Sequence, residues 1–391
     1  MEKRRKEEEE ENPPAAESLW DDLLPEIHQE ILSRVPYRSL CRFKCVSTAW
    51  LALCSDPAVR RRSPQTLSGF FCHSQVDAGD GRRQYGVSFL NLSGWGRPVV
   101  DDPSLGFVRG YRYVTPIHCC SGILICYCWK FDMSDEADFV VCNPATEEIW
   151  AVLPVPRNKT MTRLNTARLC FDPAVPHCFK VFVFVQSFAG VQRVEVYSSD
   201  TRQWTSIGSK WSSQNLMIAE ESGCVYFNGS LHLAVCHPAV KVDREGVIRS
   251  MVTFDAEGET WRRIRMPNTS NNGFFGLSQG RLYTARVENE GKCRLLVWVL
   301  EDHATGLWTL RCTASILELL GSPCRAPNEF YHPVAIHPEC NLIFLQDVAP
   351  EGLLMSYNMD TAKLDGSLGD RWAQRFHPYI PCFVEKPPVP Q

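Results

Sequence analysis

The densest group of side chains that could bind a soft metal ion lies at 118–128, with His118, Cys119, Cys120, Cys126 and Cys128. Structural zinc sites usually combine a Cys-x₂₋₄-Cys pair with a second pair of ligands at a distance. Adjacent cysteines and a Cys-x-Cys do not have that spacing. In an extended strand, Cys126 and Cys128 would point to one face, which predicts that they pack against a neighbouring sheet. We therefore expect neither a metal site nor another cofactor.

Catalytic motifs give the same expectation. We expect no nucleophile elbow of the Gly-x-Ser-x-Gly type, no phosphate loop of the Gly-x₄-Gly-Lys type and no His-Glu-x₂-His metal motif. Four His-Pro pairs, which begin at His237, His332, His337 and His377, are typical of turns in loops. The sequence thus predicts that the chain is not an enzyme, while distant groups brought together by folding stay open as an alternative.

Composition, charge and the length of apolar runs limit the kinds of protein that this chain can be. The chain has 391 residues, 44% hydrophobic and 22% charged, with a net charge of −4 that does not suggest a nucleic-acid partner. Its longest apolar runs, such as 295–300, are too short to cross a membrane. The first residues lack the pattern of a signal peptide, so we expect the 18 cysteines to be reduced thiols and the protein to be cytoplasmic, nuclear or both.

The N-terminal part changes character at residue 18. Residues 1–17 form a charged tail that we expect to be disordered. Residues 18–62 show helical spacing and predict three short helices: one with Pro25 in its first turn and ended by Pro36, one starting near Ser39, and one capped by Ser47 and stopped at 55–57. A helical domain this small usually completes its core against a partner.

Residues 67–387 contain short apolar strands separated by turn residues, and the pattern repeats. A strand, an Asp- or Asn-containing turn and a Trp recur at Trp150, Trp204, Trp261 and Trp308, with weaker copies ending at Trp95 and Leu364. The six positions are spaced by 55, 54, 57, 47 and 56 residues. Such a period, made only of strands, predicts an all-β propeller, with six blades favoured and seven possible.

This repeat also predicts roles for its parts. One Trp per repeat favours packing between blades over a ligand groove. Contacts to a target protein would come from loops that vary without harming the scaffold, and the candidates are 76–84, 130–138, 157–166, 237–249 and 321–332. The sequence does not select one of them, and the substrate-binding residues are unknown.

The helical segment resembles the F-box family. The matching residues are Leu24-Pro25-x-Ile27, Ile31-Leu32-x-Arg34-Val35-Pro36, Arg38-Ser39-Leu40-x-Arg42-Phe43-Lys44-Cys45-Val46-Ser47-x-x-Trp50 and Ser55-Asp56-Pro57. The resemblance implies docking on a Skp-type adaptor and, through it, on a cullin scaffold. The implied adaptor-binding residues are Leu24, Pro25, Ile27, Ile31, Leu32, Val35, Pro36, Leu40, Val46 and Trp50. An alternative is that these residues only form the core of their own domain.

The rest of the chain resembles the Kelch-like, F-box-associated propeller of plant F-box proteins. The similarity is carried by Cys120-Ser121-Gly122-Ile123-Leu124, Val141-Cys142-Asn143-Pro144-Ala145-Thr146, Phe171-Asp172-Pro173 and Phe179-Lys180-Val181-Phe182. Together the two resemblances imply the substrate receptor of an SCF-type ubiquitin ligase, with a target protein on the propeller. From the charge and the short apolar runs we expect neither a nucleic-acid nor a membrane partner. A non-ligase F-box scaffold bound to the same adaptor and a propeller enzyme stay open as alternatives.

Overall fold

In the computed structural model the chain divides into two compact units, residues 1–64 and 65–391. The structure describes residues 24–63, 67–77, 83–92, 100, 102–131, 136–155, 166–176, 178–187, 190–207, 216–218, 223–236, 249–255, 261–267, 274–288, 293–320, 331–347, 353–368, 374–384 and 386. The statements below concern these residues. No described helix is both long and apolar enough to span a membrane.

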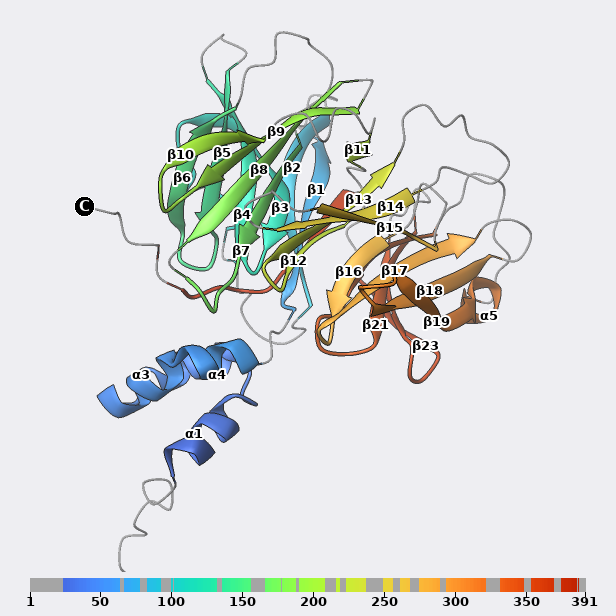
Figure 1. Ribbon diagram of the computed structural model, residues 1–391, viewed down its shortest axis with the longest axis horizontal. Helices are drawn as coiled ribbons and strands as arrows, with labels where there is room; N and C mark the ends of the chain where they lie inside the picture. Colours follow the sequence, from blue (N-terminus) through green and yellow to red (C-terminus); the bar gives the residue numbers. More distant parts are fainter. Residues whose placement is uncertain are drawn as a thin grey trace, which may run out of the picture. The chain divides into compact units, whose positions relative to one another are not determined.

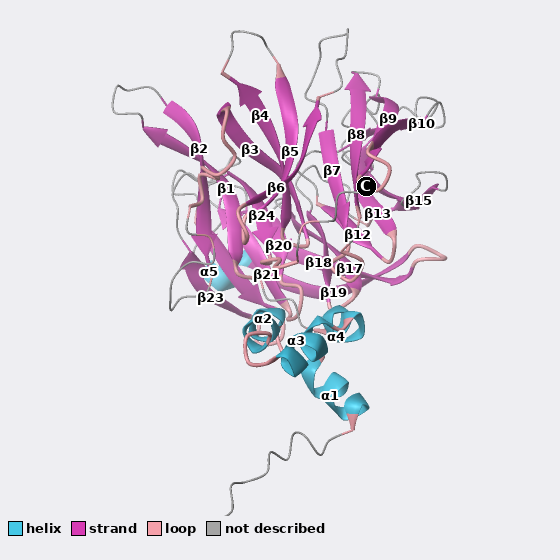
Figure 2. Ribbon diagram, turned by 90° about the vertical axis from the view of Figure 1, so that its left-hand side faces the viewer, coloured by secondary structure: helices cyan, strands magenta, loops and turns pink. Residues whose placement is uncertain are grey.

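The first unit is helical (Figure 2). Its described part contains four helices, and not the three expected: α1 (Pro25–Leu32), α2 (Tyr37–Phe43), α3 (Thr48–Ser55) and α4 (Pro57–Arg62). Pro25 stands in the first turn of α1, and the Ser47 hydroxyl accepts a hydrogen bond from the Trp50 backbone N–H, so both expected start signals are confirmed.

The predicted end of the third helix at 55–57 is confirmed, because α3 ends at Ser55, but the same segment also begins the unexpected α4. The Asp56 carboxylate accepts a hydrogen bond from the Ala58 backbone N–H at 2.8 Å, and Pro57 occupies the first turn of α4. Both features favour the start of a helix, because the cap satisfies a free N–H and proline has none to lose. The second helix likewise begins at Tyr37, before the expected Ser39.

A small core holds these helices together. The buried side chains are Leu32, Leu40, Cys54 and Val59, one from each helix. The rings of Phe43 and Trp50 pack edge to face beside them, with their centroids 5.4 Å apart. A core of this size stabilises a unit by only a few kcal/mol, so single large-to-small substitutions in it matter.

The second unit is a propeller of six antiparallel sheets (Figure 1). Blades 1 and 2 are β3 (Tyr111–Cys120), β4 (Ile123–Lys130), β5 (Ala137–Asn143) and β6 (Glu148–Pro154), then β7 (Thr166–Phe171), β8 (Phe179–Ser187), β9 (Gly190–Ser198) and β10 (Gln203–Ile207). Blade 3 is β11 (Met217–Ile218), β12 (Cys224–Phe227), β13 (Ser230–Cys236), β14 (Arg249–Asp255) and β15 (Trp261–Arg265).

Blades 4 and 5 are β16 (Phe274–Ser278), β17 (Arg281–Glu288), β18 (Arg294–Asp302) and β19 (Leu307–Ser315), then β20 (Tyr331–Ile336), β21 (Leu342–Asp347), β22 (Leu354–Asn358) and β23 (Lys363–Leu368). Blade 6 joins both ends of the unit in the order β2 (Arg83–Asn91), β1 (Gly69–Asp77) and β24 (Gln374–Tyr379). A short helix, α5 (Ile316–Leu320), follows β19. The favoured count of six blades is therefore the observed one.

Two features close the ring. One strand from each blade, namely β3, β7, β12, β16, β20 and β24, lies next to the corresponding strand of the following blade. The C-terminal strand β24 pairs antiparallel with β1, with Gly69 opposite Tyr379. This pairing joins residues some 300 positions apart, and it leaves the inner edge of the ring without a gap at the chain ends.

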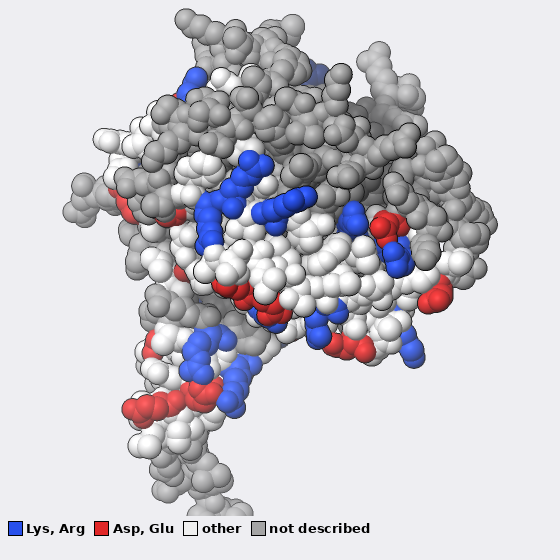
Figure 3. Space-filling model, turned by 45° about the vertical axis from the view of Figure 1, so that its right-hand side comes forward, with Lys and Arg blue, Asp and Glu red and all other residues white. Residues whose placement is uncertain are grey.

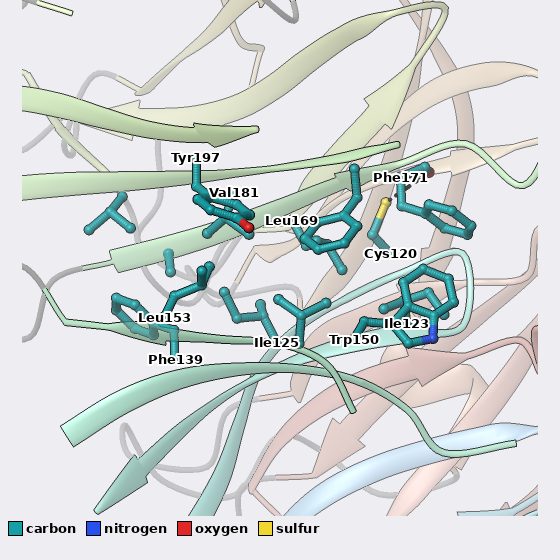
Figure 4. Close-up of a cluster of buried hydrophobic side chains, with 14 of the residues drawn as sticks. Cys120, Ile123, Ile125, Phe139, Trp150, Leu153, Leu169, Phe171, Val181 and Tyr197 are labelled. Atoms are coloured by element: carbon teal, nitrogen blue, oxygen red, sulfur yellow. Dashed lines mark hydrogen bonds between the residues drawn. The ribbon is translucent and has the colours of Figure 1, made fainter. Parts of the chain in front are cut away.

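Hydrophobic layers between neighbouring blades form the core. Figure 4 shows the layer between blades 1 and 2, where Trp150 of β6 packs edge to face on Phe171 of β7, with ring centroids 5.2 Å apart. Trp204 packs against the same layer from blade 2, Trp261 packs against the layer between blades 2 and 3, and Trp308 packs against the layer between blades 3 and 4. The predicted role of these tryptophans between blades is confirmed.

The segment after β24 forms a tail that packs on blade 1. Cys382 and Val384 are buried in the layer between blades 1 and 2, and the Asn143 side-chain amide donates to the Cys382 carbonyl at 2.8 Å. Lys386 donates from Nζ to the Ile149 carbonyl at 2.8 Å. The chain end thus adds a second connection between blade 6 and blade 1, which the sequence pattern did not indicate.

Two further expectations are wrong. His332-Pro333 lies inside β20 and His377-Pro378 inside β24, and not in loops. Both strands are edge strands of their sheets, and the register of β20 shifts after Pro333, which is where a strand tolerates proline. In addition, Cys293 is disulfide-bonded, so the cysteines are not all reduced.

Candidate functional sites

The first candidate site is the apolar surface of the helical unit. Leu24, Ile27 and Ile31 follow one another at spacings of three and four residues, which places them on one face of α1. Their exposed fractions are 64%, 41% and 40%. Val46, in the connection to α3, is 64% exposed, and Pro25 and Pro36 are also exposed. Six of the ten implied adaptor-binding residues therefore present a surface.

The other four residues have an internal position. Leu32 and Leu40 are 1% and 0% exposed and belong to the core of the unit. Val35 and Trp50 are half-buried against that core. Leu32 and Leu40 can therefore support a docking surface only by holding the helices in place.

One exposed apolar residue was missed from the sequence. Leu51 of α3 is 48% exposed, whereas its neighbours Trp50 and Cys54 face the core. The signal was present, because α3 carries more apolar residues than one buried face can use. An isolated exposed leucine needs no explanation, but five exposed large apolar side chains in one small helical unit favour a binding surface.

Charged groups on the same unit fix its helices. Glu30 of α1 forms ion pairs with Arg34 one turn later and with Arg62 of α4. The hydrogen bond from Arg62 is the largest cause that lowers the pKa of Glu30. Gln29 also donates to the Asp56 carboxylate at 2.8 Å. Figure 3 shows basic and acidic side chains next to each other on the helices. These contacts connect α1, which carries the exposed apolar face, to both ends of α4.

The second candidate is the His- and Cys-rich segment 118–128. His118 of β3 is buried, and its Nδ1 accepts a hydrogen bond from the Leu169 backbone N–H of β7 at 3.1 Å. Burial is the main cause that lowers the pKa of His118 to about 3, with the Arg168 charge adding to it and a hydrogen bond to the Cys224 backbone opposing it. A neutral imidazole with both ring nitrogens engaged connects three inner strands.

The cysteines of this segment are protonated thiols. Burial is the largest cause that raises the pKa of Cys119 and of Cys120, in the latter case to about 11. Cys126 and Cys128 face blade 6 in one hydrophobic layer, as their spacing predicted. Thiolates are the form that binds metals and attacks substrates, and these thiols are not in that form. Among the residues described, no group of three or more His, Cys, Asp or Glu is placed to hold a metal ion.

The segment 276–280 reads Gly-Leu-Ser-Gln-Gly, so the expectation that a Gly-x-Ser-x-Gly pattern is missing is wrong. The structural context is different from that of a nucleophile elbow, which needs a strand, a sharp turn and a helix. Ser278 ends β16 in a hairpin to β17, is 1% exposed, and donates its hydroxyl to the His337 carbonyl at 2.7 Å. This serine connects blades 4 and 5 and has no base beside it in the described contacts.

The candidate target-binding loops fall largely outside the described residues. This applies to 78–82, 132–135, 157–165, 237–248 and 321–330. The predicted contacts of these loops therefore stay predictions.

Comparison with known proteins finds two family models and several plant relatives that match this chain. A family model described as an F-box domain matches residues 20–62, and one described as an F-box associated beta propeller domain matches residues 108–300. In Arabidopsis thaliana, F-box protein At5g07610 is 23% identical over 77% of this chain and 73% of its own length. Putative F-box protein At3g10240 is 25% identical over 71% and 68%. F-box protein At5g49610 is 24% identical over 75% and 80%.

Among solved structures, an oligogalacturonate lyase in complex with manganese covers 72% of this chain and is covered over 70% of its own length, with 12% identity and a TM-score of 0.41. A similarity at that level supports no conclusion about this chain. The helical unit is an F-box domain, and the second unit contains an F-box-associated β-propeller domain. The chain belongs to the plant-type F-box proteins that carry this propeller. The finer likeness to Kelch repeats stays a prediction.

Proposed function

We propose that this protein is the substrate receptor of an SCF-type ubiquitin ligase. In this proposal the F-box binds a Skp-type adaptor and, through it, a cullin, and the propeller holds a target protein. The chain then supplies no catalytic residue, and the protein acts in the cytoplasm, the nucleus or both. The observation that carries the proposal is the F-box match at residues 20–62 together with the exposed apolar face of α1.

The arrangement of the helical unit supports adaptor docking. Leu24, Ile27 and Ile31 project from α1 while Leu32 anchors the same helix in the core. Burying an exposed apolar side chain of this kind in an interface contributes about 1–3 kcal/mol, and a few such residues dominate most interfaces. Val46 and Leu51 are further exposed apolar side chains of the same unit.

The test is capture of a purified Skp-type adaptor and cullin by the full chain. Ile27→Asp/Ile31→Asp replaces two exposed residues and leaves the core intact, and it should reduce capture by at least tenfold. The matched control is Val152→Asp, a 51% exposed apolar residue on β6 of the propeller, which should capture normally. Failure of the well-folded wild-type chain to capture adaptor would overturn the proposal. Capture without ubiquitination of bound partners would favour a non-ligase scaffold.

A further inference from the structure

The outer strand of blade 3 has an unusual charge. β15 runs Trp261-Arg262-Arg263-Ile264-Arg265, and all three arginines are exposed. None of the other five outer strands (β2, β6, β10, β19 and β23) contains more than one basic residue. The chain as a whole has a net charge of −4, so this strand is opposite in sign to the average of the protein.

One edge of β15 is open. β15 pairs with β14 from Phe254 opposite Trp261 to Ser250 opposite Arg265, and no strand in the described part of the chain pairs with its other edge. An open edge presents a row of backbone N–H and C=O groups, and the group that satisfies such a row is another extended polypeptide.

The arginines flank this edge on both faces of the sheet. Arg262 lies on the face of Ile264, which packs toward blade 4, and it donates to the Ala304 carbonyl there. Arg263 and Arg265 lie on the face of Trp261, which packs toward blade 2. Residues two apart in a strand are about 6.6–6.8 Å apart, so the last two guanidinium groups repeat at the spacing of alternate side chains on a paired strand.

The charges of these two arginines are available for a partner. No described carboxylate lies within ion-pair distance of Arg263 or Arg265. The Nε of Arg263 donates to the Ser250 hydroxyl at 2.9 Å, which orients the guanidinium and leaves its two terminal nitrogens for other acceptors. A planar fork held in this way suits a carboxylate.

We propose that β15 binds an acidic, extended segment of the target protein, which adds to blade 3 as a further strand. Carboxylates at alternate positions of the segment meet Arg263 and Arg265, and the backbone pairs with the open edge. The same arginines repel a basic segment and disfavour pairing with a neutral one, so they give specificity as well as affinity. The inference rests on the proposed role of the propeller in holding a target.

The experiment measures binding of a fluorescent peptide of about nine residues, with Glu alternating with Val or Thr, to the full chain by anisotropy at roughly physiological salt. A matched peptide carries Gln in place of Glu. We expect binding of the Glu peptide only, weakened about tenfold or more by Arg263→Gln/Arg265→Gln. The control Arg109→Gln/Arg112→Gln removes two exposed charges elsewhere on the propeller and should leave binding unchanged.

Two further probes separate strand addition from general attraction of anions. N-methylation of alternate backbone amides keeps every carboxylate but blocks pairing, so it should abolish binding. A single-stranded oligonucleotide of equal charge should not compete at equal concentration. Binding that survives N-methylation, equal competition by the oligonucleotide, equal binding of the Gln peptide, or full binding by Arg263→Gln/Arg265→Gln would each overturn the inference.

A separate measurement of adaptor capture distinguishes the ligase proposal from the β15 proposal, and Arg263→Gln/Arg265→Gln should capture the adaptor normally. If the wild-type chain captures the adaptor but does not bind the peptide, only the role of β15 is contradicted. Peptide binding by a wild-type chain that captures no adaptor would contradict the ligase proposal and leave the β15 site in place.

Discussion

Replacement of Asn143 by alanine tests how strongly the C-terminal tail holds the propeller together. Asn143 ends β5 and is fully buried. Its Oδ1 accepts from the Ala145 backbone N–H at 3.0 Å and closes the turn, and its Nδ2 donates to the Cys382 carbonyl at 2.8 Å. Alanine removes both bonds, and the buried Cys382 carbonyl is left without this donor.

A matched variant isolates the contribution of the tail. Asn358 ends β22 in an equivalent turn, where its Oδ1 accepts from the Asp360 and Thr361 backbone N–H groups at 2.9 and 3.1 Å. Its turn lies in blade 5, and the described hydrogen bonds of the Asn358 side chain stay within that turn. Loss of the turn bonds costs about 0.5–1.5 kcal/mol in each variant, and an unsatisfied buried carbonyl costs a further 1–3 kcal/mol or so. We expect Asn143→Ala to destabilise by about 2–4 kcal/mol and Asn358→Ala by about 0.5–1.5 kcal/mol.

Urea unfolding of the full chain, followed by tryptophan fluorescence, gives the difference from the shift in midpoint at a common m-value. Hydrogen exchange of residues 380–384 supplies a local measurement, which should become faster in Asn143→Ala and stay the same in Asn358→Ala. Equal loss of stability in both variants, or unchanged exchange in the tail, would refute the argument that this bond connects the chain end to blade 1.

Three other substitutions have defined outcomes. Gly122→Ala places a methyl group in steric overlap with the Ile380 carbonyl oxygen, while Gly229→Ala meets nothing within 4 Å at a similar positive φ. Thermal unfolding should therefore show that Gly122→Ala loses about 1–3 kcal/mol more stability than Gly229→Ala. Burial lowers the pKa of His118 from 6.5 to about 3 in the folded protein, so its contribution to the free energy of unfolding is complete above pH 6.5 and is lost as the pH falls toward 3. Chemical unfolding at several pH values should show that the free energy of unfolding depends less steeply on pH in His118→Gln, by about 1.4 kcal/mol per pH unit between pH 6 and 4. Leu40→Ala should cost about 2–5 kcal/mol, and hydrogen exchange should then show the F-box unit unprotected while the propeller is unaffected.

Local signals explain why much of the fold was predictable. The helix starts at Pro25 and Ser47 depend on neighbouring residues only, and both predictions agree with the observed helices. The blade count followed from six repeat positions, because Trp150, Trp204, Trp261 and Trp308 each end the same strand-and-turn unit and two weaker copies end at Trp95 and Leu364. At 55–57 the predicted end of the third helix agrees with the structure, and the start of α4 was missed because Asp and Pro can both end one helix and begin the next.

Features that depend on distant residues were not predictable in this way. The pairing of β24 with β1 and the packing of the C-terminal tail on blade 1 bring together residues that are far apart in the sequence, and no local pattern relates them. The same holds for His118, for which the spacing of the nearby cysteines argued against a metal site but could not identify the partners. Its actual partners, Leu169 and Cys224, come from two other blades. A histidine between inner strands can be recognised only when those strands are placed side by side.

The F-box shows what the structure adds to a motif. In the sequence, Leu24, Ile27, Leu32 and Leu40 are equivalent members of one apolar pattern, since spacing along a helix does not say how wide the buried face is. In the folded unit the first two are exposed and the last two form the core. A substitution at Leu32 or Leu40 would abolish adaptor capture by unfolding the domain and would give no information about contact. Only changes at the exposed positions, with the core intact, can test docking itself.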